Sequence, residues 1–242
     1  MTFRASLLTA GAAFVTLALL MVSGPTLEGQ GARGKAALMN PAEAKEQAPA
    51  TFKANFDTSA GSFVVEVHRD WAPNGADRFY NLVKRGYFDG CRFYRVISGF
   101  MAMAQFGING APEISKAWVG QYIPDDPVRT ARPAADGSIT KRAETAPSNT
   151  KGYMTFTSPG LNRRSIHVVI HLADNSTLDS SLVPFGQVVL GLDVVEKLYS
   201  AYGDAAPTGK GPMLTPLYAQ GNAYLEKEFP RLDYIKTATI AQ

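Results

Sequence analysis

The sequence has 242 residues, of which 45% are hydrophobic, 10% aromatic and 19% charged. This length fits one large domain or two small ones, and the apolar content excludes a chain that is disordered throughout. The formal net charge is +3 and is spread along the chain, so the composition does not indicate a nucleic-acid-binding protein. A single cysteine, Cys91, excludes an internal disulfide framework and a metal site built from several cysteines.

Residues 1–24 have the pattern of a targeting segment. Arg4 precedes an uncharged, mainly apolar stretch at residues 5–22, and the next charged residue is Glu28. Such a stretch is long for a signal peptide and just long enough to span a bilayer, and no clear small-x-small cleavage site follows it. We therefore expect a signal peptide or an N-terminal membrane anchor. The protein is then periplasmic or secreted, and with an uncleaved anchor it is attached to the inner membrane.

Residues 25–50 are expected to form a flexible linker, because they are rich in Gly, Ala, Pro, Glu and Lys and show little periodicity. One ordered domain is expected at residues 51–242. Residues 52–56 and 63–67 alternate between apolar and polar side chains around a Gly-containing turn, which predicts a β-hairpin. Pro73 then begins a predicted helix with an apolar face, which ends at Gly86.

The rest of this domain is predicted to contain mainly short strands. They are expected at residues 92–97, 100–105, 152–157, 165–172, 183–189 and 232–240. Helices are expected at residues 192–202 and 222–229. Residues 106–150 are predicted to be an irregular insertion, with a mobile surface loop at 132–148, and residues 203–242 a C-terminal extension. Short strands with two clear helices favour a mainly β fold, a closed barrel with capping helices.

The sequence offers little for metal, cofactor or nucleophile chemistry. His167 and His171 are four residues apart, but the β-branched residues between them favour a strand, in which this spacing spans about 13 Å. One ion cannot bridge that distance. Gly29, Gly31 and Gly34 form a G-x-G-x-x-G pattern without the strand and helix of a dinucleotide site, and no G-x-S-x-G motif is present. We expect no metal and no cofactor.

Short motifs follow one another in order between residues 52 and 202. They are D-T-S-A-G at 57–61, A-P-N at 72–74, G-Y-F-D-G at 86–90, F-Y-R-V-I-S-G-F-M at 93–101, G-Y-M-T-F-T at 152–157, V-P-F-G at 183–186 and G-L-D-V-V-E at 191–196. This series resembles the cyclophilin family of peptidyl-prolyl cis–trans isomerases. The resemblance implies a closed antiparallel eight-stranded barrel capped by two α-helices, and isomerase activity on X–Pro bonds. The C-terminal forty residues go beyond the minimal family domain.

Arg95 resembles the catalytic arginine of this family. Rotation about an X–Pro bond meets a barrier of about 18–20 kcal/mol, because the prolyl nitrogen is conjugated with the carbonyl. A cation that hydrogen-bonds the nitrogen as it pyramidalises lowers that barrier, while an apolar slot grips the proline ring. Phe100 and Met101 resemble walls of that slot. On residue chemistry alone, the alternative for Arg95 is a structural arginine that pairs with a carboxylate.

The chain departs from the family pattern at the glutamine of the hallmark motif. Met103 stands where that glutamine is expected, and Gln105 follows two residues later, as after a two-residue insertion. An even insertion preserves the facing of a strand, so we expect Gln105 to point inward and to act with Arg95. The substrate-binding residues that the resemblance implies, besides Phe100 and Met101, are Met103, Thr157, His167, Val169, Leu178 and Leu182.

The slot is expected to be shallower than in the family, because Val169 replaces an aromatic floor and Leu182 a common histidine. We interpret the chain as an isomerase for folding or unfolded exported proteins. We expect its partners to be proline-containing polypeptides and not nucleic acid, and we expect it to act as a monomer. The alternative is a catalytically weak proline-peptide-binding or chaperone module with the same fold. A third and less favoured interpretation is a secreted barrel that binds lipid or another component of the cell envelope.

Overall fold

The computed structural model describes Met1, residues 34–129 and residues 146–241. The chain divides into a unit from Met1 to Gly31 and a compact unit from Ala32 to Gln242, and residues 34–129 and 146–241 belong to the second. The targeting segment expected at residues 1–24 and most of the loop expected at 132–148 lie outside the described residues. Within the described part of the chain, no helix has both the length and the apolar character needed to cross a bilayer.

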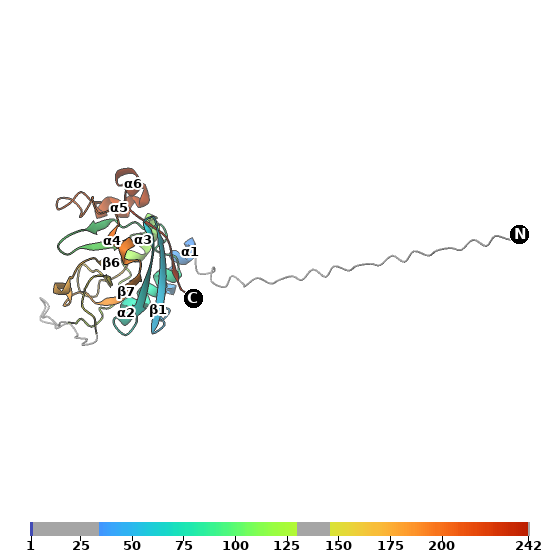
Figure 1. Ribbon diagram of the computed structural model, residues 1–242, viewed down its shortest axis with the longest axis horizontal. Coiled ribbons are helices and arrows are strands. Elements are labelled where there is room, and N and C mark those ends of the chain that lie inside the picture. Colours follow the sequence, from blue (N-terminus) through green and yellow to red (C-terminus); the bar gives the residue numbers. More distant parts are fainter. Residues whose placement is uncertain (2–33, 130–145, 242) are drawn as a thin grey trace. The chain divides into compact units, whose positions relative to one another are not determined.

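Eight strands form one curled sheet (Figure 1). In sheet order they are β3 (Arg95–Ile97), β4 (Met103–Phe106), β6 (Val168–His171), β5 (Tyr153–Phe156), β7 (Pro184–Leu190), β2 (Gly61–His68), β1 (Thr51–Thr58) and β8 (Ile235–Ile240). Every neighbouring pair is antiparallel. The predicted mainly β, antiparallel fold class is therefore confirmed.

The two edges of the curled sheet are linked through residues next to β3 and β8. The Gly90 N–H donates to the Ile235 carbonyl (2.8 Å), and the Ile235 N–H donates to the Cys91 carbonyl (2.8 Å). A third bond runs from the Phe93 N–H to the Asp233 carbonyl (2.9 Å). These bonds, rather than a continuous ladder between β3 and β8, join the edges.

The β1–β2 hairpin follows directly from the alternation in the sequence. Buried and exposed residues alternate along β1, and Phe56 of β1 is paired with Phe63 of β2. Their ring centroids lie 4.8 Å apart. Gly61 has a φ of +132°, and a Cβ there would lie 3.1 Å from the Val194 side chain, so the turn requires glycine.

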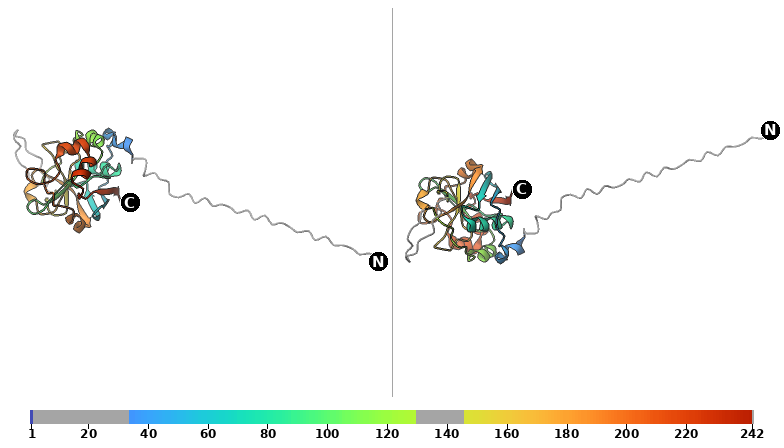
Figure 2. Two further views of the ribbon diagram at one scale, coloured as in Figure 1. Left: turned by 90° about the horizontal axis from the view of Figure 1, so that it is seen from above. Right: turned by 90° about the horizontal axis from the view of Figure 1, so that it is seen from below.

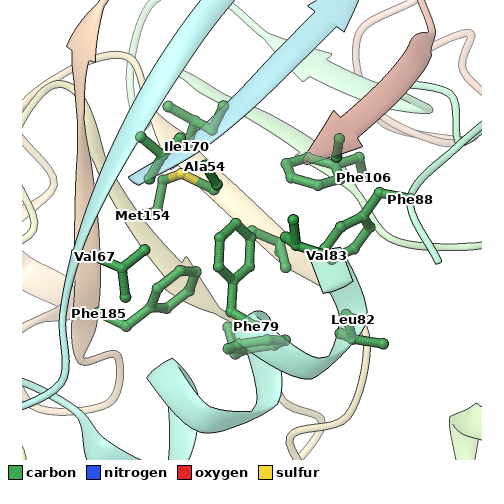
Figure 3. Packing of buried hydrophobic residues seen from close by; sticks show 14 of the residues in the cluster. Ala54, Val67, Phe79, Leu82, Val83, Phe88, Phe106, Met154, Ile170 and Phe185 are labelled. Carbon is green, nitrogen blue, oxygen red and sulfur yellow. The ribbon is translucent and has the colours of Figure 1, made fainter. Parts of the chain in front are cut away.

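The core lies between the curled sheet and helix α2 (Pro73–Lys84), as Figure 3 shows. The ring of Phe79 on α2 lies 4.8 Å from that of Phe185 on β7 and 5.7 Å from that of Phe88. A fully buried phenylalanine contributes about 1.5–3 kcal/mol relative to an exposed one, so these rings hold α2 firmly against the sheet. The helix expected from Pro73 is confirmed.

The remaining helices differ in part from the expectation. Helix α6 (Asn222–Glu228) was expected, whereas α5 (Leu214–Gln220) was not. Helix α3 (Pro112–Val119) lies in the stretch expected to be irregular and packs against α5. Figures 1 and 2 show α5 and α6 at the opposite end of the sheet from α2.

Helix α4 (Leu192–Glu196) is much shorter than the helix expected at 192–202. The Tyr199 N–H donates to the Asp233 carboxylate (2.8 Å) instead of continuing the helical ladder. Four residues later, Gly203 pairs with Val96 of β3 as an isolated β-bridge. Tertiary contacts therefore end the helix early and bring the chain beside β3.

Residues 34–50 are folded against the rest of the domain. For this part of the chain, the expectation that residues 25–50 form a flexible linker is wrong. They contain α1 (Lys35–Leu38) and the 3₁₀ turn η1 (Pro41–Glu43), and Ala48 is buried in the core. The Ala48 N–H donates to Asp77 of α2 (2.8 Å), and the Trp118 indole N–H of α3 donates to the Leu38 carbonyl (2.6 Å). Side chains on helices that are distant in the sequence hold this segment in place, so the composition of the segment itself does not predict that it is ordered.

Candidate active site

The β3–β4 hairpin places Gln105 directly opposite Arg95. The register pairs Arg95 with Gln105, Val96 with Ala104, and Ile97 with Met103. The strand expected at 100–105 therefore begins only at Met103, and residues 98–102 form the tip of the hairpin. Met103 and Ala104, which separate Gln105 from the position expected for the glutamine, pair with Ile97 and Val96 in the ladder, and this register brings Gln105 opposite Arg95.

A chain of contacts connects four of the predicted site residues. Arg95 Nη1 donates to Gln105 Oε1 (3.3 Å) and lies 3.5 Å from Met103 Sδ. Gln105 Nε2 in turn donates to Thr157 Oγ1 (3.3 Å). The side chain of Arg95 is 32% exposed, so its guanidinium is within reach of a ligand. The structure thus assembles Arg95, Met103, Gln105 and Thr157 into one polar cluster on neighbouring strands.

This cluster lies on the outer face of the curled sheet, which corrects the expectation that Gln105 points inward. Ala104 and Phe106, its neighbours on β4, belong to the hydrophobic core, and Figure 3 shows Phe106 there. Since side chains alternate along a strand, Gln105 faces the other side. Val169 of β6 is opposite Gln105 and has no exposed surface, so it lies beneath the site surface and does not line it.

Asp204 contributes a carboxylate that sequence reasoning did not single out. Arg95 Nε donates to Asp204 Oδ1 (2.7 Å) and Nη2 to Oδ2 (2.8 Å), a two-pronged ion pair. The Arg95 hydrogen bonds hold the pKa of Asp204 below its usual value, and the same bonds raise the pKa of Arg95. Arg95 is therefore both a carboxylate-paired arginine and a partly exposed cation beside Gln105.

His167 is held between two tyrosines. Tyr94 Oη lies 2.7 Å from Nδ1, and Oη of Tyr218 on α5 lies 2.6 Å from Nε2. Burial of the ring lowers the pKa of His167 to about 4, so the imidazole is neutral near pH 7. It then donates through one nitrogen and accepts through the other. The Thr157 N–H donates to the His167 carbonyl (3.0 Å), which connects this trio to the arginine cluster.

The other predicted site residues lie away from Arg95 or point into solvent. Phe100, at the hairpin tip, is 88% exposed, and Met101 beside it has a φ of 54°. Leu178 and Leu182 line a cavity of about 630 Å³ whose wall includes Ser158 and Arg164 but not Arg95. Phe100 is thus exposed to solvent, and Leu178 and Leu182 belong to a cavity that Arg95 does not line.

His171, the second of the two histidines that are four residues apart, also contacts polar neighbours through both ring nitrogens. His171 Nδ1 lies 2.9 Å from Asn175 Nδ2, and Nε2 lies 3.3 Å from Thr155 Oγ1. Burial lowers its pKa to about 4. Among the described residues, no group of three His, Cys, Asp or Glu side chains could hold a metal ion. The Arg95 guanidinium, held by Asp204, can donate hydrogen bonds to a ligand at this site.

The fold and this site define the chain as a mainly β, cyclophilin-like protein. Two crystal structures of a cyclophilin type peptidyl-prolyl cis-trans isomerase from Cryptosporidium parvum share its fold. The first covers 79% of this chain and 98% of the solved one, with a TM-score of 0.54 and 16% identity. The second, determined in the presence of the dipeptide Ala-Pro, has a TM-score of 0.53.

Sequence comparison identifies the family. The profile described as "Cyclophilin type peptidyl-prolyl cis-trans isomerase/CLD" matches residues 53–215. "Peptidyl-prolyl cis-trans isomerase-like 1" of Rhizopus delemar is 31% identical over 149 residues, covering 62% of this chain and 81% of the relative. A Schizosaccharomyces pombe isomerase is 30% identical over 141 residues, covering 58% and 81%. This chain belongs to the cyclophilin type peptidyl-prolyl cis-trans isomerases, which confirms the resemblance noted in its motifs.

Proposed function

We propose that this isomerase acts on X–Pro bonds of exported polypeptides and that Arg95 carries the catalysis. The observation that supports this most directly is the partly exposed Arg95 guanidinium, whose Nη1 points along Gln105 and Met103 on the outer face of the sheet. A polypeptide can approach this face without opening the core.

The mechanism requires neither a nucleophile nor a metal. Arg95 donates a hydrogen bond to the prolyl nitrogen as conjugation is lost and the nitrogen lone pair becomes available. The Gln105 amide holds the rotating carbonyl, and the Met103 side chain gives the proline ring an apolar contact. These interactions strengthen as the bond twists, so they stabilise the transition state more than the planar ground state.

Export is inferred from the pattern of residues 1–24. One charged residue followed by a long apolar stretch favours entry into an export pathway. The substrates are then folding or unfolded chains in the periplasm or outside the cell. Cell fractionation tests this: deletion of residues 2–24 is expected to leave the protein in the cytoplasm, and an unchanged location would contradict export.

The decisive experiment is the isomerisation rate of a short X–Pro peptide with the purified full chain. Arg95→Ala removes a charge-assisted hydrogen bond worth roughly 2–4 kcal/mol in the transition state, so the rate constant should fall about 30- to 1000-fold. Arg69→Ala is a matched control, because Arg69 makes the same two-pronged bond to an aspartate, Asp77 of α2, but follows β2 instead of lying on β3. Normal activity of Arg95→Ala would refute the proposed mechanism.

The second candidate is a catalytically weak module that binds proline-containing peptides. The buried Val169 and the separation of Leu182 from Arg95 favour it, because they leave little apolar surface beside the guanidinium. A wild-type protein that binds a proline peptide but does not accelerate its isomerisation would support this candidate against the enzyme.

A further inference from the structure

The carboxylate of Asp204 accepts two hydrogen bonds from one edge of the Arg95 guanidinium. It takes the Nε hydrogen and one Nη2 hydrogen at 2.7 and 2.8 Å, which is close to ideal geometry for a charge-assisted pair. Nη1, at the opposite edge, makes the longer contacts to Gln105 (3.3 Å) and Met103 (3.5 Å). A substrate can replace these longer contacts more readily than the two bonds to Asp204.

The loop at residues 203–211 is folded around Asp204. At its start, Gly203 pairs with Val96, so Asp204 lies beside β3 one residue from this bridge, as Arg95 does. At its end, the Gly211 N–H donates to the Asp204 carbonyl (2.7 Å). A Cβ at Gly209 would lie 2.1 Å from the same carbonyl oxygen, so only glycine allows this close approach.

The Asp204 side chain is also held by its own backbone. The Ala205 N–H donates to Asp204 Oδ1 (2.7 Å), the oxygen that accepts from Arg95 Nε. The carboxylate therefore has a backbone hydrogen bond that does not depend on Arg95. A long arginine side chain loses much rotational freedom when it is ordered, and a preformed acceptor lowers the cost of that ordering during catalysis.

We propose that Asp204 is a positioning residue that holds the Arg95 guanidinium edge-on and presents Nη1 to the prolyl bond. The proposal rests on the proposed function of Arg95 and extends it to the C-terminal loop. Asp204 itself does not contact the reacting atoms. Its effect on the reaction passes entirely through Arg95.

The opposite role, a carboxylate that competes with substrate for Arg95, predicts the opposite sign. A competing carboxylate slows the enzyme, so its removal raises kcat/KM. A positioning carboxylate keeps Nη1 in place, so its removal lowers kcat, because the interaction matters most in the transition state. Peptide isomerisation by the full chain separates the two.

The experiment measures kcat and KM for a short X–Pro peptide with Asp204→Ala, Arg95→Ala and the double variant. Misplacement of a catalytic group by about 1 Å costs up to about 100-fold, so Asp204→Ala should lower kcat about 10- to 100-fold with little change in KM. Asp204→Asn keeps one oxygen acceptor and should lie between Asp204→Ala and wild type. In the Arg95→Ala background, Asp204→Ala should change kcat/KM by less than about twofold.

Asp77→Ala is the matched control for loss of stability. Asp77 also accepts from an arginine Nε and Nη2 and from one backbone N–H, that of Ala48. Both aspartate variants should lower the melting temperature, but only Asp204→Ala should lower kcat.

Each remaining outcome overturns the proposal. If Arg95→Ala is impaired but kcat in Asp204→Ala is unchanged or raised, the positioning role of Asp204 is refuted and the function of Arg95 stands. An equal fold-loss in the Arg95→Ala background shows that Asp204 acts independently. A wild-type chain without isomerase activity removes the proposed function and this inference together.

Discussion

Val169 illustrates how burial decides what a single residue can do. It lies opposite Gln105 on the site face of β6 but has no exposed surface. A larger side chain there has to displace the atoms that cover Val169, so we expect it to push against the strands that carry the site. The family resemblance implies an aromatic floor at this position, but the burial of Val169 means that an aromatic ring cannot simply be placed here.

Val169→Phe is accordingly expected to destabilise the fold by about 1–3 kcal/mol through overpacking. Chemical denaturation of the variant and the wild type measures the difference. Tighter binding of a proline peptide with unchanged stability would show instead that the site has room for the ring.

The two buried histidines predict how stability depends on pH. His167 and His171 both have pKa values of about 4 in the folded protein, because burial disfavours the charged imidazole. Their value in the unfolded chain is about 6.5. As the pH falls from about 6.5 to 4, the unfolded state therefore binds protons that the folded state does not, and stability decreases.

For two such groups the free energy of unfolding changes with pH by up to about 2.7 kcal/mol per pH unit between pH 6.5 and 4. Urea unfolding at several pH values measures it. The double variant His167→Asn, His171→Asn should show a shallower dependence between pH 6.5 and 4. The same slope in that variant would contradict the assignment to these two rings.

At the scale of elements, the site depends on how closely β4 approaches the segment that carries His167. Gly107 follows β4 with a φ of +121°, and a Cβ there would lie 1.9 Å from the Ile166 carbonyl oxygen. The absence of a side chain at Gly107 thus allows the residues after β4 to pass directly beside Ile166 and His167.

Gly107→Ala is expected to cost more than about 2 kcal/mol of stability, because the new methyl group clashes with backbone and the φ value is strained. Thermal unfolding checks this. Gly120→Ala serves as the control, since Gly120 has a φ of −91° and its added Cβ meets nothing within 4 Å. Equal melting temperatures for the two variants would mean that β4 shifts without cost.

The regular elements with strong patterns were predictable, and those ended or created by tertiary contacts were not. The β1–β2 hairpin and α2 show clear periods of two and 3.6 residues. By contrast, α4 stops early because Asp233 captures the Tyr199 amide, and α3 forms where a helix can pack against α5. Such contacts join residues that are far apart in the sequence, so no local sequence pattern predicts them.

At the scale of the whole molecule, residues 34–50 belong to the folded unit. Their contacts with α2 and α3 place Ala48 in the same core as the strands. They lie on other elements than Arg95 and Gln105. The segment therefore contributes to stability without contributing a group to the site.

A chain that begins at residue 51 should melt at a lower temperature than one that begins at residue 34. Lost hydrogen bonds at about 0.5–1.5 kcal/mol each, together with the exposed core around Ala48, predict a deficit of about 2–4 kcal/mol. Both should have the same kcat at a temperature at which both are folded. Identical melting temperatures would show that this segment is a linker after all.

Taken alone, the sequence determined the family and the antiparallel β class, and it singled out Arg95 as the candidate catalytic residue, because these depend on local alternation and on motifs that are contiguous in the chain. Only the tertiary structure decided that Gln105 meets Arg95 on the outer face, that Val169 is covered, and that Asp204 holds the guanidinium. The register of the β3–β4 hairpin depends on which residues form its tip, here residues 98–102. The pairing of Arg95 with a carboxylate 109 positions away depends on where a loop folds back onto β3. Both are set by packing and hydrogen bonding between distant segments.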